Sequence, residues 1–342
     1  MNIFGLLPSE IKERIGTDFP AYRYKQLMHW LYGKYSFEPE MMSDLPKDFK
    51  AWLKESFSFS LPQVQEILKG SDGSSKYLLK LEDGKLIEMV LMPLDKKLTL
   101  CVSSQVGCRR KCSFCATGRL GLKRKLEVHE IVGQILLAAA ESQPQRLTNI
   151  VFMGMGEPLD NFDNVAKALK IIQAEESLSF SPRRTTLSTC GIADGIIRLA
   201  DSGIKCKLAV SLNSAKADTR TQLMPINRRY PLPVLKAALI HYLSKSSFRV
   251  TFEYILIPEV NMGLSDIKAL QKYVGDLSCK INFIPFNPVP QLPYRQPTEA
   301  EIESFMANAQ LIKQAITLRR SRGTDISGAC GQLAGKHNTH KE

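Results

Sequence analysis

The chain has 342 residues, of which 44% are hydrophobic and 23% are charged, a balance typical of a globular enzyme. No apolar run is long enough to cross a bilayer, and the first residues lack the basic segment and continuous apolar core of a secretory signal. Eight cysteines without such a signal indicate a reducing compartment, where metal binding or catalysis is more frequent than a structural disulfide. We therefore expect a cytoplasmic protein without a membrane partner.

Basic residues outnumber acidic ones by 46 to 34, and the formal net charge is +12. Many of the cations lie in short runs: Arg109–Lys111, Lys123–Lys125, Arg183–Arg184, Arg228–Arg229, and Arg319–Arg320 with Arg322. Such runs predict a polyanionic partner, because each neutralised phosphate releases counterions. Any single run is also consistent with a solvated basic surface. Several runs lie beside the unusual residues described below, which favours RNA or DNA as the partner.

In chain order, residues 1–58 are expected to form a small helical accessory domain. The segment Tyr22–Tyr32 carries apolar and aromatic residues at helical spacing. Such a stripe is more often core than a clamp for nucleic acid, so we assign Trp30 to the core and leave Arg23 and Lys25 open as RNA contacts.

Residues 59–95 are expected to form a short β-rich extension. From Val64 to Ser103, runs of alternating apolar and polar residues are separated by SDGSS, DG and LDKK, which predicts a meander of short strands. Within this meander, the pattern by itself describes Glu88 as an exposed strand carboxylate.

From residue 96 to residue 342 the chain alternates strand and helix patterns. Six β-rich runs and a late extra one lie at 98–103, 148–154, 183–189, 206–212, 249–257, 280–286 and 316–321. Helical periods lie between them at 128–141, 164–174, 192–201, 234–243 and 265–274. This alternation predicts an α/β fold with a parallel sheet, as a partial (β/α) barrel or a doubly wound sheet. In both architectures, reactive groups gather at the carboxyl ends of the strands.

The most unusual stretch, Cys101–Gly118, follows the first of these strands and reads CVSSQVGCRRKCSFCATG. Cys108, Cys112 and Cys115 lie within eight residues, between Gly107 and Gly118, which predicts a loop around a metal. A structural zinc site requires four ligands, and no second pair follows. A four-iron cluster bound by three cysteines leaves one iron open to a ligand other than protein. Three inert thiols that lie close by chance are the weaker interpretation, because glycines rather than an apolar periodic pattern flank them.

The second strand ends in FMGMGEP. Its two glycines allow the backbone to approach a ligand, and Glu157 would direct a carboxylate towards an ammonium group. Glycine-rich turns between a strand and a helix are common, so this turn alone is weak evidence for a ligand site. Together with the cysteine loop it is strong evidence.

These motifs resemble the radical S-adenosylmethionine superfamily and, more closely, its RlmN/Cfr family of RNA adenosine methyltransferases. The resemblance extends from about residue 96 to the C-terminus and includes CVSSQVGC, CSFCATG, VFMGMGEP, LMPIN, FNPVP and RRSRGTDISGACGQLAG. It implies a partial, TIM-like (β/α)6 barrel, one [4Fe–4S] cluster and two molecules of S-adenosylmethionine per turnover. It also implies an electron donor of the flavodoxin or ferredoxin type. A monomer is the default expectation for the oligomeric state.

The resemblance implies a role for each matching residue. Cys108, Cys112 and Cys115 would bind the cluster. Cys330 would carry the methyl group, Cys101 would be its disulfide partner, and Glu88 would accept a proton. The residues that would surround S-adenosylmethionine are Gly156, Glu157, Ser188, Ser211, Leu212, Asn213 and Asn287. Cys330 lies between small residues, in a loop expected to be mobile, whereas the remaining cysteines are expected to be structural: Cys190, Cys206 and Cys279.

The resemblance further implies methylation at carbon 2 of adenosine in RNA, at adenosine 2503 of 23S rRNA and at adenosine 37 of tRNAs. Carbon 2 is electrophilic, so ordinary nucleophilic methyl transfer cannot reach it. In the family scheme, one S-adenosylmethionine methylates Cys330, and a second yields a 5′-deoxyadenosyl radical that activates the methylthio group. The resulting protein–RNA adduct loses a proton to Glu88 and is released when Cys101 forms a disulfide with Cys330.

Two positions depart from the family pattern. Asn213 stands where the family has His, and Arg109–Lys111 separates cluster ligands that usually have small or apolar residues between them. Other functions also stay open. The chain could be a carbon-8 adenosine methyltransferase of 23S rRNA that confers antibiotic resistance. It could also be an RNA-binding iron–sulfur protein without methyltransferase activity, against which the presence of both Cys101 and Cys330 argues. A zinc-binding RNA module is the least favoured.

Overall fold

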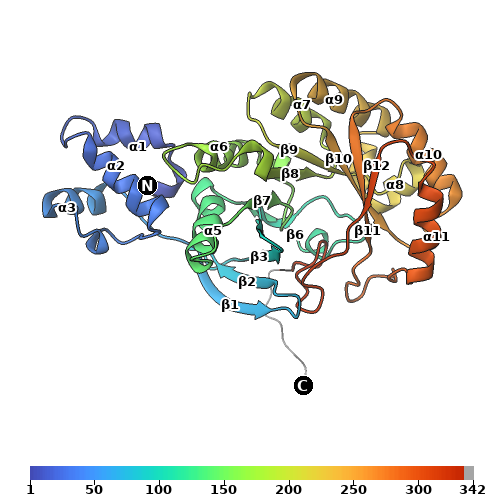
Figure 1. Cartoon of the computed structure of the whole chain (residues 1–342), viewed down its shortest axis with the longest axis horizontal. Coiled ribbons are helices and arrows are strands. Elements are labelled where there is room, and N and C mark those ends of the chain that lie inside the picture. Colours follow the sequence, from blue (N-terminus) through green and yellow to red (C-terminus); the bar gives the residue numbers. More distant parts are fainter. Residues whose placement is uncertain (335–342) are drawn as a thin grey trace.

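The computed structural model describes residues 1–334. Short helices form one end of the molecule, a mixed sheet runs through its centre, and longer helices cover the outside of that sheet (Figure 1). Within the described residues, no helix is both long enough and apolar enough to span a membrane.

The N-terminal segment is helical, as predicted. It comprises α1 (Pro8–Ile15), α2 (Tyr22–Met28) and α3 (Lys47–Ser56), with a π-helical turn over His29–Gly33 and 3₁₀ turns over Ile3–Gly5 and Pro39–Met41. Trp30 is buried, and its indole N–H donates to the Asp44 carboxylate, so its assignment to the core is confirmed. The Arg23 guanidinium donates to the Gln26 side chain at 2.8 Å, within the same group of helices.

Within residues 1–334, ten strands form one sheet in the order β1-β2-β3-β4-β7-β8-β9-β10-β11-β12. The first four are antiparallel neighbours, which confirms the predicted meander: β1 (Gln63–Lys69), β2 (Ser75–Lys80), β3 (Leu86–Leu94) and β4 (Lys97–Cys101). From β4 onward the strands are parallel: β7 (Asn149–Phe152), β8 (Thr185–Thr189), β9 (Lys207–Ser211), β10 (Val250–Leu256), β11 (Cys279–Pro285) and β12 (Ala315–Leu318). The six predicted parallel strands and the late extra one are therefore confirmed, in an open sheet.

A helix lies at each of the five predicted helical periods: α5 (Val128–Glu141), α6 (Phe162–Gln173), α7 (Ala193–Asp201), α9 (Leu232–Lys245) and α10 (Leu264–Val274). Two further helices were not predicted: α8 (Ala217–Leu223) and α11 (Glu299–Ala309). Local sequence sets some of their boundaries. At the start of α11, the Thr298 hydroxyl accepts from the Glu301 amide at 3.3 Å, and the Glu301 carboxylate accepts from the Thr298 amide at 2.8 Å. This reciprocal cap satisfies two otherwise unpaired donors of the first turn. Short 3₁₀ turns lie at Pro158–Asn161, Pro182–Arg184 and Pro225–Arg228.

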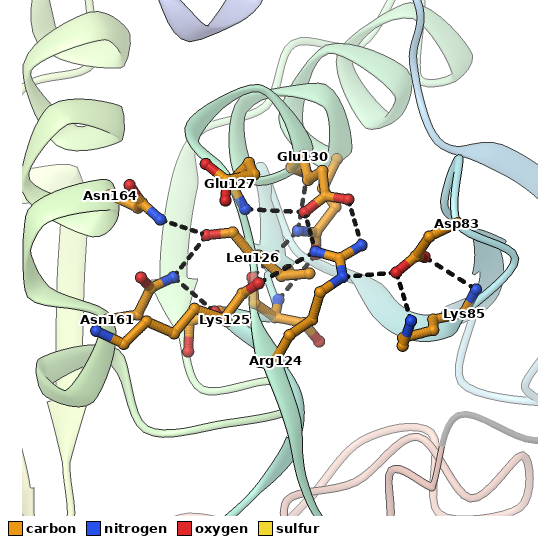
Figure 2. A network of polar contacts seen from close by, with 12 residues as sticks. Asp83, Lys85, Arg124, Lys125, Leu126, Glu127, Glu130, Asn161 and Asn164 are labelled. Carbon is orange, nitrogen blue, oxygen red and sulfur yellow. Dashed lines mark hydrogen bonds and ion pairs between the residues drawn. The ribbon is translucent and has the colours of Figure 1, made fainter.

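A separate antiparallel pair, β5 (Gln105–Cys108) and β6 (Gly121–Lys125), flanks the short helix α4 (Ala116–Arg119). Figure 2 shows how a polar network joins this pair to the rest of the fold. Arg124 of β6 donates to Asp83 in the β2–β3 turn at 2.7 Å and to both oxygens of Glu130 in α5 at 2.7 Å. Arg124 was predicted to belong to a run that contacts a polyanion. Its guanidinium instead joins three elements, which corrects that prediction for this residue.

The same network continues on the other side of β6 (Figure 2). The Leu126 carbonyl accepts from the side-chain amides of Asn161, at 2.7 Å, and Asn164, at 2.8 Å. The hairpin that encloses the cysteine loop is therefore fixed to the β2–β3 turn, to α5 and to the start of α6.

Candidate active site

The cysteine loop runs from β5 to α4. Cys108 is the last residue of β5, and Cys112 and Cys115 follow before α4 begins. The prediction that the three thiols lie on a loop is confirmed for Cys112 and Cys115, whereas Cys108 belongs to a strand. The Ala116 amide donates to the Gly331 carbonyl at 2.7 Å, so this loop is joined directly to the segment that carries Cys330.

The three cysteines line a cavity of about 850 Å³, here called the cofactor cavity. It is also lined by five of the residues predicted to surround a cofactor: Gly156, Glu157, Ser188, Ser211 and Asn213. The other two do not line it, because Leu212 is buried in the core and Asn287 faces the C-terminal segment. The Asn287 amide donates to the Cys330 carbonyl at 3.2 Å and to the Ser321 hydroxyl at 2.9 Å.

Gly154 and Gly156 allow the chain to approach itself. A Cβ at Gly154 would lie 2.7 Å from the Val102 backbone, and one at Gly156 would lie 2.6 Å from the Gln105 side chain. Gly156 also has a φ of +104°, which a larger residue rarely adopts. Packing of the turn after β7 on residues 102–105 therefore requires both glycines, which also line the cofactor cavity.

Glu157 is 4% exposed and joins the ends of two parallel strands. Its Oε1 accepts from the Leu159 amide at 3.1 Å, and its Oε2 accepts from the Cys190 amide at 2.7 Å. Burial raises the pKa of Glu157, and these hydrogen bonds oppose the rise. The carboxylate is thereby held in one orientation on the wall of the cofactor cavity, beside the cysteine loop.

Burial disfavours the ionised form of all three thiols. Burial raises the pKa of Cys108 to about 12 and also raises the pKa of Cys112 and of Cys115. Over residues 1–334, no three His, Cys, Asp or Glu side chains lie close enough together to bind one metal ion. Bound iron would offset the cost of ionising these thiols.

A second cavity, of about 840 Å³ and here called the cysteine cavity, shares Cys330 with the first. Cys101 lines it from the end of β4, and both cysteines are free thiols. Burial raises the pKa of Cys101 to about 12 and also raises the pKa of Cys330. The guanidinium of Arg319, which lines both cavities, opposes both rises. Cys330 therefore borders both cavities, with Cys101 and a cation beside it.

The segment that carries Cys330 is anchored. The Thr117 hydroxyl donates to the Leu333 carbonyl at 2.6 Å, and the Gln332 side chain donates to the Pro288 carbonyl at 2.9 Å. Both bonds hold the chain just after Cys330 against the rest of the fold. The small residues around Cys330 serve close packing here, because Ala329 and Gly328 are buried.

Glu88 is 1% exposed, which corrects its description as an exposed strand carboxylate. Its Oε1 forms an ion pair with Lys76 of β2 at 3.1 Å, and Lys76 is itself 4% exposed. Its Oε2 accepts from the Ala334 amide at 2.7 Å. Glu88 lines neither of the two cavities, but it holds the backbone four residues after Cys330.

Asn213, the departure from the family pattern, has its side chain engaged within the fold. Its Oδ1 accepts from the Ile255 amide at 2.9 Å, and its Nδ2 donates to the Met224 sulfur at 3.2 Å. Its φ of +57° is one that Asn tolerates better than most residues. Asn213 thus fixes the turn after β9 against β10 while it lines the cofactor cavity.

Several residues that line or support the cofactor cavity were not predicted from the sequence. Cys190 was expected to be structural, but it lines the cofactor cavity. Arg220 is fully buried and donates to the Cys190 carbonyl at 2.8 Å and to the Ser211 carbonyl at 2.9 Å, which holds two strand ends together. Glu253 and Arg319 also line this cavity. A glutamate in the middle of the apolar strand RVTFEYILI was the available indication for Glu253, since a parallel strand is buried on both faces.

The basic run inside the cysteine loop is divided between two roles. The Arg110 guanidinium pairs with Asp160, with Nε 2.6 Å from Oδ2, and lines the cofactor cavity. Arg109 and Lys111 are exposed, and no ion pair within residues 1–334 involves them. The prediction of a surface cation is thus corrected for Arg110, and it stays open for its two neighbours.

Residues 102–271 match the family model described as the radical SAM superfamily. The chain is 40% identical over 335 residues to the dual-specificity RNA methyltransferase RlmN of Bdellovibrio bacteriovorus, covering 97% of this chain and 84% of that protein. It is 41% identical over 348 residues to the protein of the same name from Campylobacter jejuni subsp. jejuni (strain 81-176), covering 97% of each.

A solved structure has the same fold. The crystal structure of a radical SAM methyltransferase from Sphaerobacter thermophilus matches with a TM-score of 0.94 at 40% identity, over 98% of this chain and all of that one. The identities extend over nearly the full length, and the cysteine loop lies where the superfamily model begins. The chain therefore belongs to the radical SAM superfamily and, within it, to the RlmN family of RNA methyltransferases.

Proposed function

We propose that this S-adenosylmethionine-dependent RNA methyltransferase acts on carbon 2 of adenosine, at adenosine 2503 of 23S rRNA and at adenosine 37 of tRNAs. The names of its relatives support action on RNA. The observation that carries the proposal is the position of Cys330, which borders both the cofactor cavity and the cysteine cavity. A methyl group on that sulfur can be received from one cavity and presented to an RNA base in the other.

Cys108, Cys112 and Cys115 would hold one [4Fe–4S] cluster, and S-adenosylmethionine would occupy the cofactor cavity, with two molecules used per turnover. Together these groups supply the methyl group and the radical that activates it. Glu157 would bind the ammonium end of the cofactor, because it is the oriented carboxylate beside the cysteine loop. A flavodoxin or ferredoxin would supply electrons, and the enzyme would act as a monomer.

The remaining roles belong to three side chains. Cys330 forms the covalent bond to RNA, Glu88 accepts the ring proton, and Cys101 releases the product by forming a disulfide with Cys330. One Glu88 oxygen is engaged by Ala334. RNA binding would therefore shift the C-terminal segment before that oxygen becomes the base.

The test is anaerobic turnover followed by nucleoside mass spectrometry of a 23S rRNA fragment and of tRNA. We expect 2-methyladenosine with the wild-type protein and none with Cys330→Ala, because the alanine lacks the sulfur that carries the carbon. Cys206→Ala is the control, since this cysteine is buried and lines neither cavity. A product of 8-methyladenosine would instead place the protein in the resistance branch. The absence of methylated adenosine, with cofactor cleavage intact, would reject the substrate.

The exposed cations of the cysteine loop provide a second test. We expect RNA affinity to fall steeply with salt, and the slope of log K against log salt to shrink by about 1.5 in Arg109→Gln/Lys111→Gln, because each lost phosphate contact removes roughly 0.7–0.9. The control is Lys268→Gln/Lys272→Gln on α10, where two exposed cations lie on an outer helix. Equal slopes for both double variants would mean that Arg109 and Lys111 are solvated surface cations that do not contact RNA.

A further inference from the structure

Four polar residues form a row across the last strands of the sheet. Ser211 of β9 is the register partner of Glu253 in β10, Glu253 is the partner of Asn282 in β11, and Asn282 is the partner of Thr317 in β12. Register partners on parallel strands point to the same face of a sheet. Ser211 and Glu253 both line the cofactor cavity, so the row leads into it.

The side chains of this row orient the Glu253 carboxylate. The Thr317 hydroxyl donates to Asn282 Oδ1 at 2.6 Å, and Asn282 Nδ2 donates to Glu253 Oε1 at 3.0 Å. The two hydrogen bonds determine which way the Asn282 amide faces, and that amide in turn fixes one oxygen of the carboxylate. Glu253 therefore has a defined orientation.

The other oxygen of this carboxylate has no partner. Glu253 is 7% exposed, and its Oε2 makes no hydrogen bond within residues 1–334. Arg319 lines the same cavity and favours the charged form, but it forms no ion pair with Glu253 within 4 Å. Burial raises the pKa of Glu253, and Arg319 and Asn282 oppose the rise. A buried carboxylate oxygen without a donor is costly, so a ligand that supplies one would be favoured at this position.

The position of Glu253 indicates which part of a cofactor it meets. Glu157 follows β7, and its Oε2 accepts from the Cys190 amide just after β8, so its carboxylate lies at the end of β8 beside the cysteine loop. Glu253 lies in β10, two strands beyond β8. At about 4.8 Å per strand the separation across the sheet is roughly 10 Å, which places Glu253 away from the amino-acid end of the cofactor and near its nucleoside end. The hydroxyl donors of a nucleoside are those of its ribose.

We propose that Glu253 is a further cofactor-binding residue, whose Oε2 accepts a hydrogen bond from a ribose hydroxyl of S-adenosylmethionine. The proposal rests on the assignment of S-adenosylmethionine to the cofactor cavity in the proposed function. It extends that assignment, because the row from Thr317 to Glu253 makes the site selective for ribose over deoxyribose at that hydroxyl.

The experiment measures binding without turnover. The cluster-loaded full chain is titrated calorimetrically with S-adenosylhomocysteine and with its 2′-deoxy and 3′-deoxy forms, which cannot donate a methyl group. We expect the wild type to bind at least one deoxy form about tenfold more weakly, as is typical for loss of a hydrogen bond to a charged group. Glu253→Gln should bind the ribose form about tenfold more weakly and lose this discrimination. The Gln oxygen would stay on the Asn282 side and the Gln amide would face the cavity.

Glu303→Gln, an exposed change on α11, is the matched control and should behave as the wild type. Equal binding of all three ligands by the wild type would overturn the proposal without any variant, so a folding defect in Glu253→Gln cannot hide the answer. A loss of affinity in Glu253→Gln that is equal for all three ligands would also overturn it. RNA methylation plays no part in this measurement. A failed methylation assay with intact discrimination therefore rejects the proposed substrate and leaves the Glu253 assignment standing.

Discussion

Cys101→Ala is expected to stop the enzyme after one round and leave it covalently joined to its RNA. Cys330 and Cys101 line the same cavity, and both are free thiols in this structure. If Cys101 supplies the sulfur that releases Cys330, its loss leaves the earlier steps intact and removes the exit from the adduct. Denaturing gel electrophoresis with labelled RNA would reveal the adduct, and nucleoside analysis would show the loss of repeated turnover.

Cys279→Ala is the matched control for that variant. Cys279 and Cys101 are each 6% exposed, and both lie on strands of the same sheet. Cys279 begins its strand, whereas Cys101 ends its strand at the reactive edge. We expect Cys279→Ala to turn over without accumulating adduct. Normal turnover in Cys101→Ala would show that Cys101 has no part in the mechanism. Adduct in both variants would show that its accumulation is not caused by the loss of Cys101.

Lys76→Met is expected to destabilise the fold by about 3–5 kcal/mol, because it leaves the buried Glu88 carboxylate without its cation. The two side chains are 5% and 2% exposed and lie 3.1 Å apart, so water cannot replace the lost ammonium. Lys76→Met/Glu88→Leu should recover most of that loss, since it removes both charges together. The midpoint of urea unfolding measures each step.

Lys85→Met is the control for an ion pair in water. Lys85 pairs with Asp83 at 2.6 Å, but its side chain is 41% exposed, so the expected change is within about 0.5 kcal/mol. Equal destabilisation by Lys76→Met and Lys85→Met would mean that the Glu88 pair contributes no more than a surface contact. A double variant that is less stable than either single variant would show that Glu88 depends on partners other than Lys76.

Several features of the fold could be predicted because they depend on local periodicity. Alternation over 64–103 predicts the antiparallel meander, and strand and helix periods after it predict the parallel strands. Three closely spaced cysteines between Gly107 and Gly118 predict a loop, and the structure has this loop at Cys112 and Cys115. Trp30 is predicted to belong to the core because apolar and aromatic residues lie at helical spacing around it.

Other features could not be predicted because they depend on contacts between distant segments. Glu88 is buried by Lys76 on the neighbouring strand and by Ala334, which lies 246 residues away. Arg124 belongs to a basic run in the sequence, but its guanidinium donates hydrogen bonds to Asp83 and Glu130 (Figure 2). A pattern of residue types cannot state which partner a charged side chain will meet, because ion pairing depends on the final register and packing.

The sequence by itself determined the family, the α/β architecture and the identity of the cysteines, because these follow from long motifs and from local periodicity. The tertiary structure decided which residues meet around them. It placed Cys330 between two cavities, ordered its loop against α4, and aligned Thr317, Asn282 and Glu253 through the register of three parallel strands. Register joins residues far apart in the chain, so the orientation of Glu253 exists only after the sheet has formed.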